Sequence, residues 1–121
     1  MTEKGFPTRV TFRNMEPSAA VEEHVREAAA KLATFHDRIV GCDVTIEQDH
    51  RRQHQGKLFQ VRVDVKLPGA EIAVSRNPDA DHAHEDAHVA IRDAFDAMKR
   101  RIQDHLEKLR ETDRTPRKST A

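Results

Sequence analysis

The chain of 121 residues has no tryptophan and no tyrosine, a single cysteine, and no excess of charge of either sign. One cysteine, Cys42, excludes a disulfide within the chain. Acidic and basic residues number 21 each, so any affinity for nucleic acid or an anionic membrane has to be local. No apolar run is long enough to span a bilayer, and the amino terminus lacks the apolar core of a signal peptide. We therefore expect one cytoplasmic domain with one hydrophobic core.

The longest helical pattern in the sequence runs from Asp81 to Leu109. Its larger apolar residues recur at steps of three and four, which places them on one continuous stripe of a helix. Acidic residues at its amino end and basic residues near its carboxyl end follow the order that the helix dipole favours. The pattern predicts a long helix with one buried face. The residues of that stripe are Ile91, Phe95, Met98, Ile102, Leu106 and Leu109.

Four shorter segments alternate apolar and polar residues, as half-buried strands do. A second helical pattern, with Ser18 as its N-cap, lies between the first two segments, and this strand–helix–strand order predicts a parallel pair. Pro68 and Gly69 predict a tight turn, which makes the third and fourth strands antiparallel. We therefore predict an α+β fold of order β-α-β-β-β-α, a four-stranded mixed sheet with two helices packed on one face. The predicted strands are 9–13, 42–47, 59–67 and 72–74.

The remaining segments indicate where the domain ends and where its loops lie. Residues 1–111 are expected to form the α+β domain, and residues 112–121 a disordered polar tail. The segment 48–57 has no apolar residue and carries more basic than acidic side chains, which predicts an exposed hairpin loop. Cys42 falls at an inward position of its strand and is expected to be a small core residue.

The sheet face away from the helices is predicted to be open to solvent. Four of the five phenylalanines are assigned to inward positions, which leaves no aromatic platform for stacking unpaired bases. Binding to RNA would then have to use phosphates and the shape of folded RNA, through arginine and lysine side chains that flank the helices. The inward phenylalanines are Phe12, Phe35, Phe59 and Phe95.

The segment from His84 to His88 matches H-E-x-x-H, in which two histidines one turn apart hold zinc and the glutamate, here Glu85, acts as a general base. A third ligand is needed, and His105 and Glu107 lie on the same predicted helix. At about 1.5 Å of rise per residue they are roughly 25 to 30 Å away. Packing of the two histidine rings at the start of the helix is therefore favoured over a zinc hydrolase site, which remains an alternative.

The second half of the long helix and the tail carry a local excess of positive charge. Residues 97 to 118 contain eight basic and four acidic residues. This excess is explained equally well by an ordinary solvent-exposed helix, in which basic residues near the carboxyl end compensate the helix dipole. On a helical projection, one flank of the apolar stripe carries Arg92, Lys99 and Arg110, the other carries Arg101 and Lys108, and Arg100 points away.

Two segments carry a family resemblance. The opening VTFRNMEPS (Val10 to Ser18) and the motif HED (His84 to Asp86) leading into VAIRDAF (Val89 to Phe95) resemble the ribosome hibernation-promoting factors. This family includes ribosome-associated inhibitor A and the proteins once labelled sigma-factor modulators. The resemblance covers roughly residues 8–110 and indicates a short form without an added carboxyl-terminal domain. Family members commonly have tyrosine where this chain has His88, which supports packing over zinc binding there.

The resemblance implies a fold similar to double-stranded-RNA-binding domains and a non-enzymatic role. The expected partner is ribosomal RNA of the small subunit at the messenger and transfer RNA channel, where binding blocks translation in stationary or stressed bacteria. Carried over residue by residue, the resemblance implies RNA contacts at Lys31, Lys99, Arg100 and Arg101. Helix geometry alone adds Arg26, Arg38, Arg92 and Lys108.

This sequence departs from the family in its neutral overall charge and in the acidic residues Glu22, Glu23 and Glu27 of the first predicted helix, which we expect to weaken the affinity for RNA. We expect a monomer with no metal, no cofactor, no small-molecule substrate and no membrane partner. A modulator that binds a regulatory protein through the open sheet face is the other alternative to a ribosome-binding role.

Overall fold

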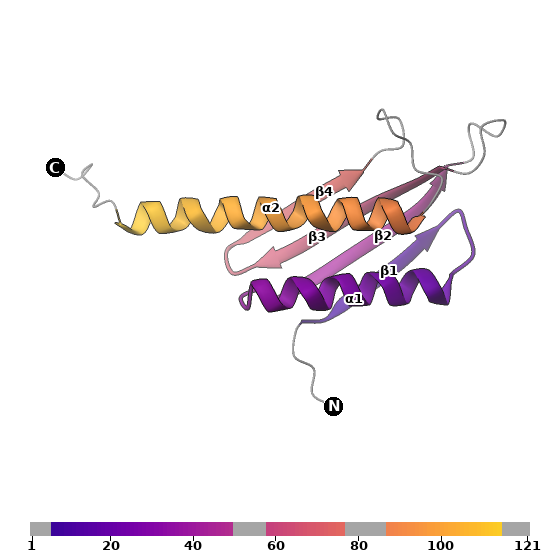
Figure 1. Ribbon diagram of the computed structural model, residues 1–121, viewed down its shortest axis with the longest axis horizontal. Helices are drawn as coiled ribbons and strands as arrows, with labels where there is room; N and C mark the ends of the chain where they lie inside the picture. Colours follow the sequence, from indigo (N-terminus) through magenta and orange to yellow (C-terminus); the bar gives the residue numbers. More distant parts are fainter. Residues whose placement is uncertain (1–5, 50–57, 77–86, 115–121) are drawn as a thin grey trace.

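The computed structural model describes residues 6–49, 58–76 and 87–114. These residues form the predicted α+β fold with the predicted order of elements, which is confirmed (Figure 1). Its elements are β1 (Thr8–Arg13), α1 (Ala19–Phe35), β2 (Gly41–Asp49), β3 (Leu58–Leu67), β4 (Ala70–Arg76) and α2 (Ala87–Arg114).

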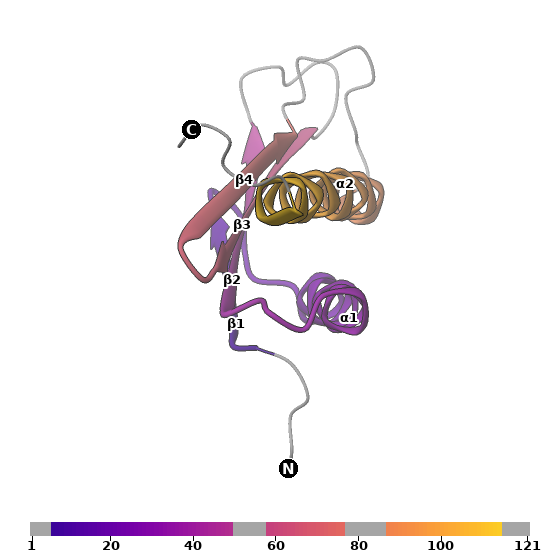
Figure 2. The same ribbon diagram turned by 90° about the vertical axis from the view of Figure 1, so that its left-hand side faces the viewer.

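The four strands lie in the sheet in their sequence order, β1-β2-β3-β4. β1 pairs parallel with β2, with Val10 opposite Val44, and the other two pairs are antiparallel. Gly69 has a φ of 77°, as the predicted turn between β3 and β4 requires, and glycine adopts this value without strain. Both helices cover the same face of the sheet, side by side, and leave the other face open (Figure 2).

The core lies between the sheet and the two helices. Alternate residues of β2 and β3 point into it, and α2 covers them by packing on β3 and β4. α1 lies beside α2 and next to β1. Cys42 is buried in this core, as predicted, and burial together with the carboxylates of Asp43 and Asp64 raises the pKa of its thiol to about 12. The fully buried larger side chains are Val25, Val44, Ile46, Val61, Val63, Val65, Ile91, Met98 and Ile102.

The ends of α1 follow from its sequence. Ser18 is the N-cap, as predicted, and its side-chain oxygen accepts a hydrogen bond from the backbone N–H of Val21 at 3.2 Å. At the other end His36 is the C-cap, and its backbone N–H donates to the carbonyl oxygen of Leu32 at 3.0 Å. These two caps fix the length of the helix, and therefore the place where the chain turns back into β2.

The long helix differs from its prediction toward its carboxyl end. The apolar stripe is buried up to Ile102, but Leu106 is half-buried and Leu109 is 50% exposed, so the prediction of an inward Leu109 was wrong. The reason is that α2 runs past the end of the sheet, which has no strand there to cover the stripe (Figure 1). α2 ends at Arg114, so the first three residues of the predicted tail are helical.

Other predicted segments lie partly outside the described residues. These are the helix start at 81–86, the rest of the tail from 115, and most of the predicted loop 48–57, whose first two residues belong to β2. Within the described part of the chain, neither helix is both long enough and apolar enough to cross a membrane.

Candidate nucleic-acid interface

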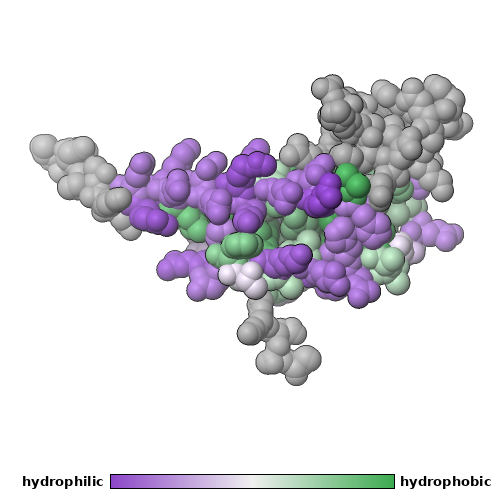
Figure 3. Space-filling model, in the orientation of Figure 1, coloured by the Kyte–Doolittle hydropathy of each residue, from purple (hydrophilic) through white to green (hydrophobic). Residues whose placement is uncertain are grey.

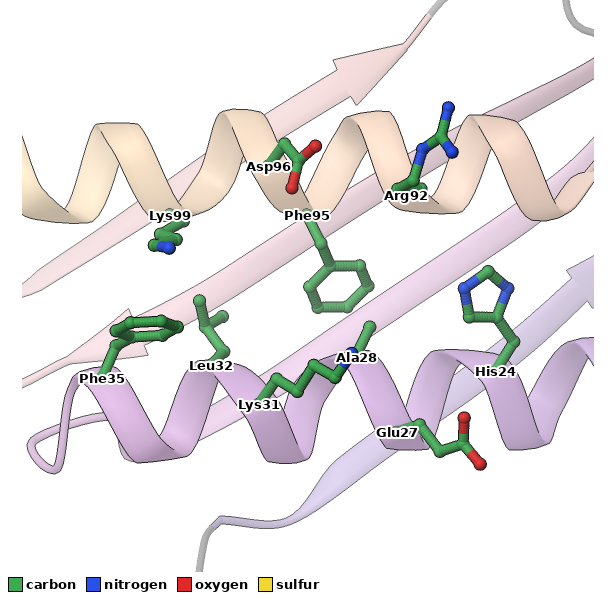
Figure 4. Close-up of a pocket in the computed structure, with 10 residues that line it drawn as sticks. All are labelled: His24, Glu27, Ala28, Lys31, Leu32, Phe35, Arg92, Phe95, Asp96 and Lys99. Carbon is green, nitrogen blue, oxygen red and sulfur yellow. The ribbon is translucent and has the colours of Figure 1, made fainter.

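The two helices border a groove on the side of the molecule away from the sheet. It encloses a cavity of about 270 Å³ lined by residues of both helices (Figure 4). Its floor is apolar, formed by Ala28 and Leu32 of α1 and Phe95 of α2. In the space-filling view, apolar surface gathers between the helices and polar surface borders it (Figure 3). The groove is therefore an apolar channel with charged edges.

Three of the predicted RNA-binding residues meet at this groove. Lys31 from α1 and Arg92 and Lys99 from α2 all line it. Glu27 and Asp96 also line it; the carboxylate of Glu27 points away from the space between the helices, whereas Lys99 turns into it (Figure 4). Basic residues of two helices that are far apart in the sequence thus line one groove.

The remaining predicted residues on α2 lie further along the helix. Arg100 and Arg101 follow Lys99 directly, and both are exposed. Lys108, two turns further on, is also exposed. Lys99 lines the groove, whereas Arg100 and Arg101 follow at steps of about 100° around the helix and therefore project from other sides of α2.

Arg26 and Arg38 lie apart from the groove. The guanidinium of Arg26 donates hydrogen bonds to the Glu22 carboxylate at 3.0 and 3.1 Å and to the backbone carbonyl of Thr8 at 3.0 Å. It therefore joins α1 to β1 on the other side of the helix. Arg38 is exposed in the connection between α1 and β2. The RNA contacts predicted for these two residues stay predictions.

Phe35 is 54% exposed, so its prediction as an inward residue was wrong. The buried side of α1 continues from Leu32 to His36, a step of four, and this places Phe35 at the edge of the groove. The ammonium group of Lys99 lies over its ring, 3.7 Å from the centroid. His36 continues the spacing of the buried residues of α1 as well as Phe35 does, so the sequence contained this signal. A histidine was not predicted to be a core residue.

His24 lines the other end of the groove and pairs with His88 of α2. The rings of His24 and His88 stack with their centroids 4.8 Å apart and an interplanar angle of 19°, and their Nδ1 atoms are 2.7 Å apart. His88 thus packs against α1 at the start of α2. Its side chain is exposed and does not belong to the buried apolar stripe of α2. No sequence signal pointed to His24 as its partner.

The H-E-x-x-H match stays largely untested, because His84 and Glu85 lie outside the described residues. Among the residues that the structure describes, no group of three or more histidine, cysteine, aspartate or glutamate side chains could hold a metal ion. The predicted absence of a zinc site at this motif therefore stays a prediction.

The open sheet face carries charges of both signs in close alternation. Arg9 lies 3.9 Å from Asp43 across β1 and β2, and Arg62 lies 3.2 Å from Asp64 within β3. On this face each of these cations is neutralised locally by a carboxylate. The groove on the opposite side, which three basic residues line against two acidic ones, is the better surface for a polyanion.

His36 is buried at the carboxyl end of α1, with 8% of its surface exposed. Its Nε2 atom has no hydrogen-bond partner among the described residues. Burial lowers the pKa of this histidine, the Lys99 ammonium lowers it further, and Asp37 acts in the opposite direction. The folded protein therefore favours the neutral form of His36.

We expect this histidine to make the protein less stable at mildly acidic pH. The folded-state pKa is lowered below the ordinary value of 6.5, so the contribution of neutral His36 is fully present above pH 6.5 and is lost as the pH falls toward the folded-state pKa. Urea unfolding between about pH 8 and pH 5 measures this loss. In His36→Phe, which keeps a ring but cannot titrate, the free energy of unfolding should fall less over the same range. Equal pH dependence in the two proteins would contradict the assignment.

Comparison with known proteins gives a family and a fold. Residues 8–110 match the family model described as sigma 54 modulation protein / S30EA ribosomal protein. The structure is similar to that of a ribosomal subunit interface protein from Coxiella burnetii, with a TM-score of 0.68 and 14% identity over 84% of this chain and 98% of that chain. It is also similar to the amino-terminal domain of Thermus thermophilus Protein Y, with a TM-score of 0.63 and 20% identity over 80% of this chain and 94% of that chain. No curated protein matches the sequence.

Proposed function

The chain belongs to the sigma 54 modulation protein / S30EA ribosomal protein family, and on this premise we propose that it is a non-enzymatic factor that binds the ribosome. The family membership confirms the resemblance inferred from the opening segment and the helix motif. The observation that carries the proposal is the extent of the match, residues 8–110, which takes in the whole sheet, α1 and all but the last four residues of α2. The Coxiella burnetii protein of similar fold is itself described as a ribosomal subunit interface protein, which supports this assignment.

We place the contact on ribosomal RNA of the small subunit, at the channel that messenger and transfer RNA use. A protein bound there excludes both RNAs, so translation stops without any catalytic step. The role is a cytoplasmic one, suited to stress or stationary phase, and it needs no cofactor.

The helix side of the molecule supports an RNA partner. Lys31, Arg92 and Lys99 present their charges from two packed helices, so these positions are held by the core and not by a loop. Cationic side chains on rigid elements suit phosphate contacts, which supply most of the affinity for folded RNA.

Local charge accounts for binding by a protein of neutral overall charge. Between residues 99 and 110, α2 carries five basic residues and two acidic ones, although the chain as a whole has 21 of each sign. Affinity for a polyanion depends on the charges that reach the phosphates, because charges further away are screened by salt.

Co-sedimentation with purified ribosomal subunits tests the proposal. The protein should sediment with small subunits and not with large ones, and binding should weaken linearly in a plot of log affinity against log salt concentration. Small subunits that already hold messenger and transfer RNA should bind less of it, because the channel is occupied. Failure to bind empty small subunits, or equal binding to empty and filled ones, would contradict the proposed site.

A further inference from the structure

Phe35 stands at the edge of the groove, with Lys99 of α2 over its ring and Lys31 one helical turn earlier on its own helix. Its ring is the exposed aromatic group at that edge, with 54% of the residue accessible. Lys31 precedes it by four residues, one helical turn, on the same side of α1, and the ammonium of Lys99 lies 3.7 Å from the ring centroid. A single exposed apolar residue is ordinary on a protein surface. An exposed ring that a lysine of the other helix covers, one turn from a second lysine, needs a further explanation.

We propose that Phe35, Lys31 and Lys99 form a binding site for one unpaired nucleotide of RNA. The base stacks on the Phe35 ring, and the two ammonium groups contact the phosphates on either side of that nucleotide. This inference rests on the proposed function, since it names the element of ribosomal RNA that the helix side recognises. It replaces the expectation from the sequence that no aromatic side chain is available for stacking.

The energetics favour a base over the lysine that now covers the ring. An exposed cation–π contact strengthens an interaction by a factor of about 2 to 5. Stacking of a base on an aromatic side chain strengthens binding by a factor of about 5 to 100. The lysine side chain is flexible, so its ammonium can leave the ring for a phosphate when the base arrives. When a base displaces Lys99, the cation–π contact is lost and two stronger contacts form, the base on the ring and the ammonium on a phosphate.

The charges around the ring select a nucleotide over an apolar peptide side chain. Both lysines would remain unpaired beside an uncharged ligand, whereas a nucleotide brings one phosphate on each side. Of the two carboxylates that line the groove, that of Glu27 points away from the space between the helices (Figure 4). The groove floor of Ala28, Leu32 and Phe95 offers no side-chain hydrogen bond to a base edge, so we expect little preference among the four bases.

Phe35→Leu tests the site on the ribosome, because leucine keeps an apolar side chain and removes the stacking surface. Its dissociation constant for small subunits should rise about 5- to 100-fold while the salt dependence stays unchanged, since no phosphate contact is lost. Lys31→Ala is the matched comparison, and it should reduce the salt slope by about one unit. If Phe35→Leu binds as tightly as the unchanged protein, the nucleotide site is wrong and the proposed function stands.

A second measurement does not depend on the ribosome. The chain has no tryptophan, so Phe35→Trp places the sole tryptophan of the protein at the site. A short single-stranded oligouridylate should quench its fluorescence by stacking, and a fully paired RNA duplex should not. If small subunits fail to bind the unchanged protein but the oligouridylate quenches, the proposed function fails and the nucleotide site holds. Absence of quenching in a variant that melts like the unchanged protein would overturn the site.

Discussion

Replacing Lys99, Arg100 and Arg101 by glutamate is expected to weaken binding to small ribosomal subunits by about 100-fold or more at low salt. The three residues follow one another on α2, with Lys99 at the groove and Arg100 and Arg101 exposed, and the change reverses three neighbouring positive charges. Each lost phosphate contact lowers the salt slope by about one unit, so the affinity of the variant should also depend less on salt. Co-sedimentation across a salt series measures both effects.

The fold should survive this change, because an exposed charge seldom contributes more than about 1 kcal/mol to stability. The matched control is Arg9, Arg13 and Lys66 to glutamate, which changes the net charge equally but on the open sheet face, where these residues are exposed. That control should keep most of its affinity. Equal weakening of both variants would show that only the net charge matters, and an unaffected Lys99, Arg100 and Arg101 variant would remove α2 from the interface.

Ile102→Ala is expected to lower the free energy of unfolding by about 2 to 5 kcal/mol. Ile102 is fully buried at the last point where the stripe of α2 is covered, and alanine leaves a cavity that the sheet and helix cannot close. Urea denaturation should show a lower midpoint with an unchanged slope.

Leu109→Ala on the same stripe is the comparison for this loss. Leu109 is 50% exposed, so its replacement should change the free energy of unfolding by no more than about 0.5 kcal/mol. A loss as large as that of Ile102→Ala would mean that the end of α2 is packed, contrary to the structure.

These two residues also show what the sequence could predict of the fold. Periodicity identified the buried side of α2 correctly, because Ile91, Met98 and Ile102 are all fully buried. It could not tell where the burial ends, since that depends on how far β3 and β4 extend beneath the helix. The strands and the Pro68-Gly69 turn were predictable because each depends on residues that are neighbours in the sequence.

The candidate site was predictable in part. Helical projection placed Arg92 and Lys99 on one flank of α2, but only the packing of α2 against α1 shows that Lys31 faces them. Arg26 shows a different limit. Its ion pair with Glu22 follows from their spacing of four residues, whereas its bond to the backbone carbonyl of Thr8 has no sequence signal.

The basic residues of α2 and the acidic residues of α1 lie at different places along the pair of helices. Both helices run in the same direction, with His88 of α2 beside His24 of α1, close to the acidic residues at the start of α1 (Figure 1). Lys99 lies 11 residues further along α2 than His88, about 16 Å away at 1.5 Å per residue. At cellular ionic strength the Debye length is about 8 Å, so the acidic start of α1 cancels only part of the field at Lys99, Arg100 and Arg101. A chain with zero formal charge can therefore approach a polyanion with the middle of α2 first, in a preferred orientation.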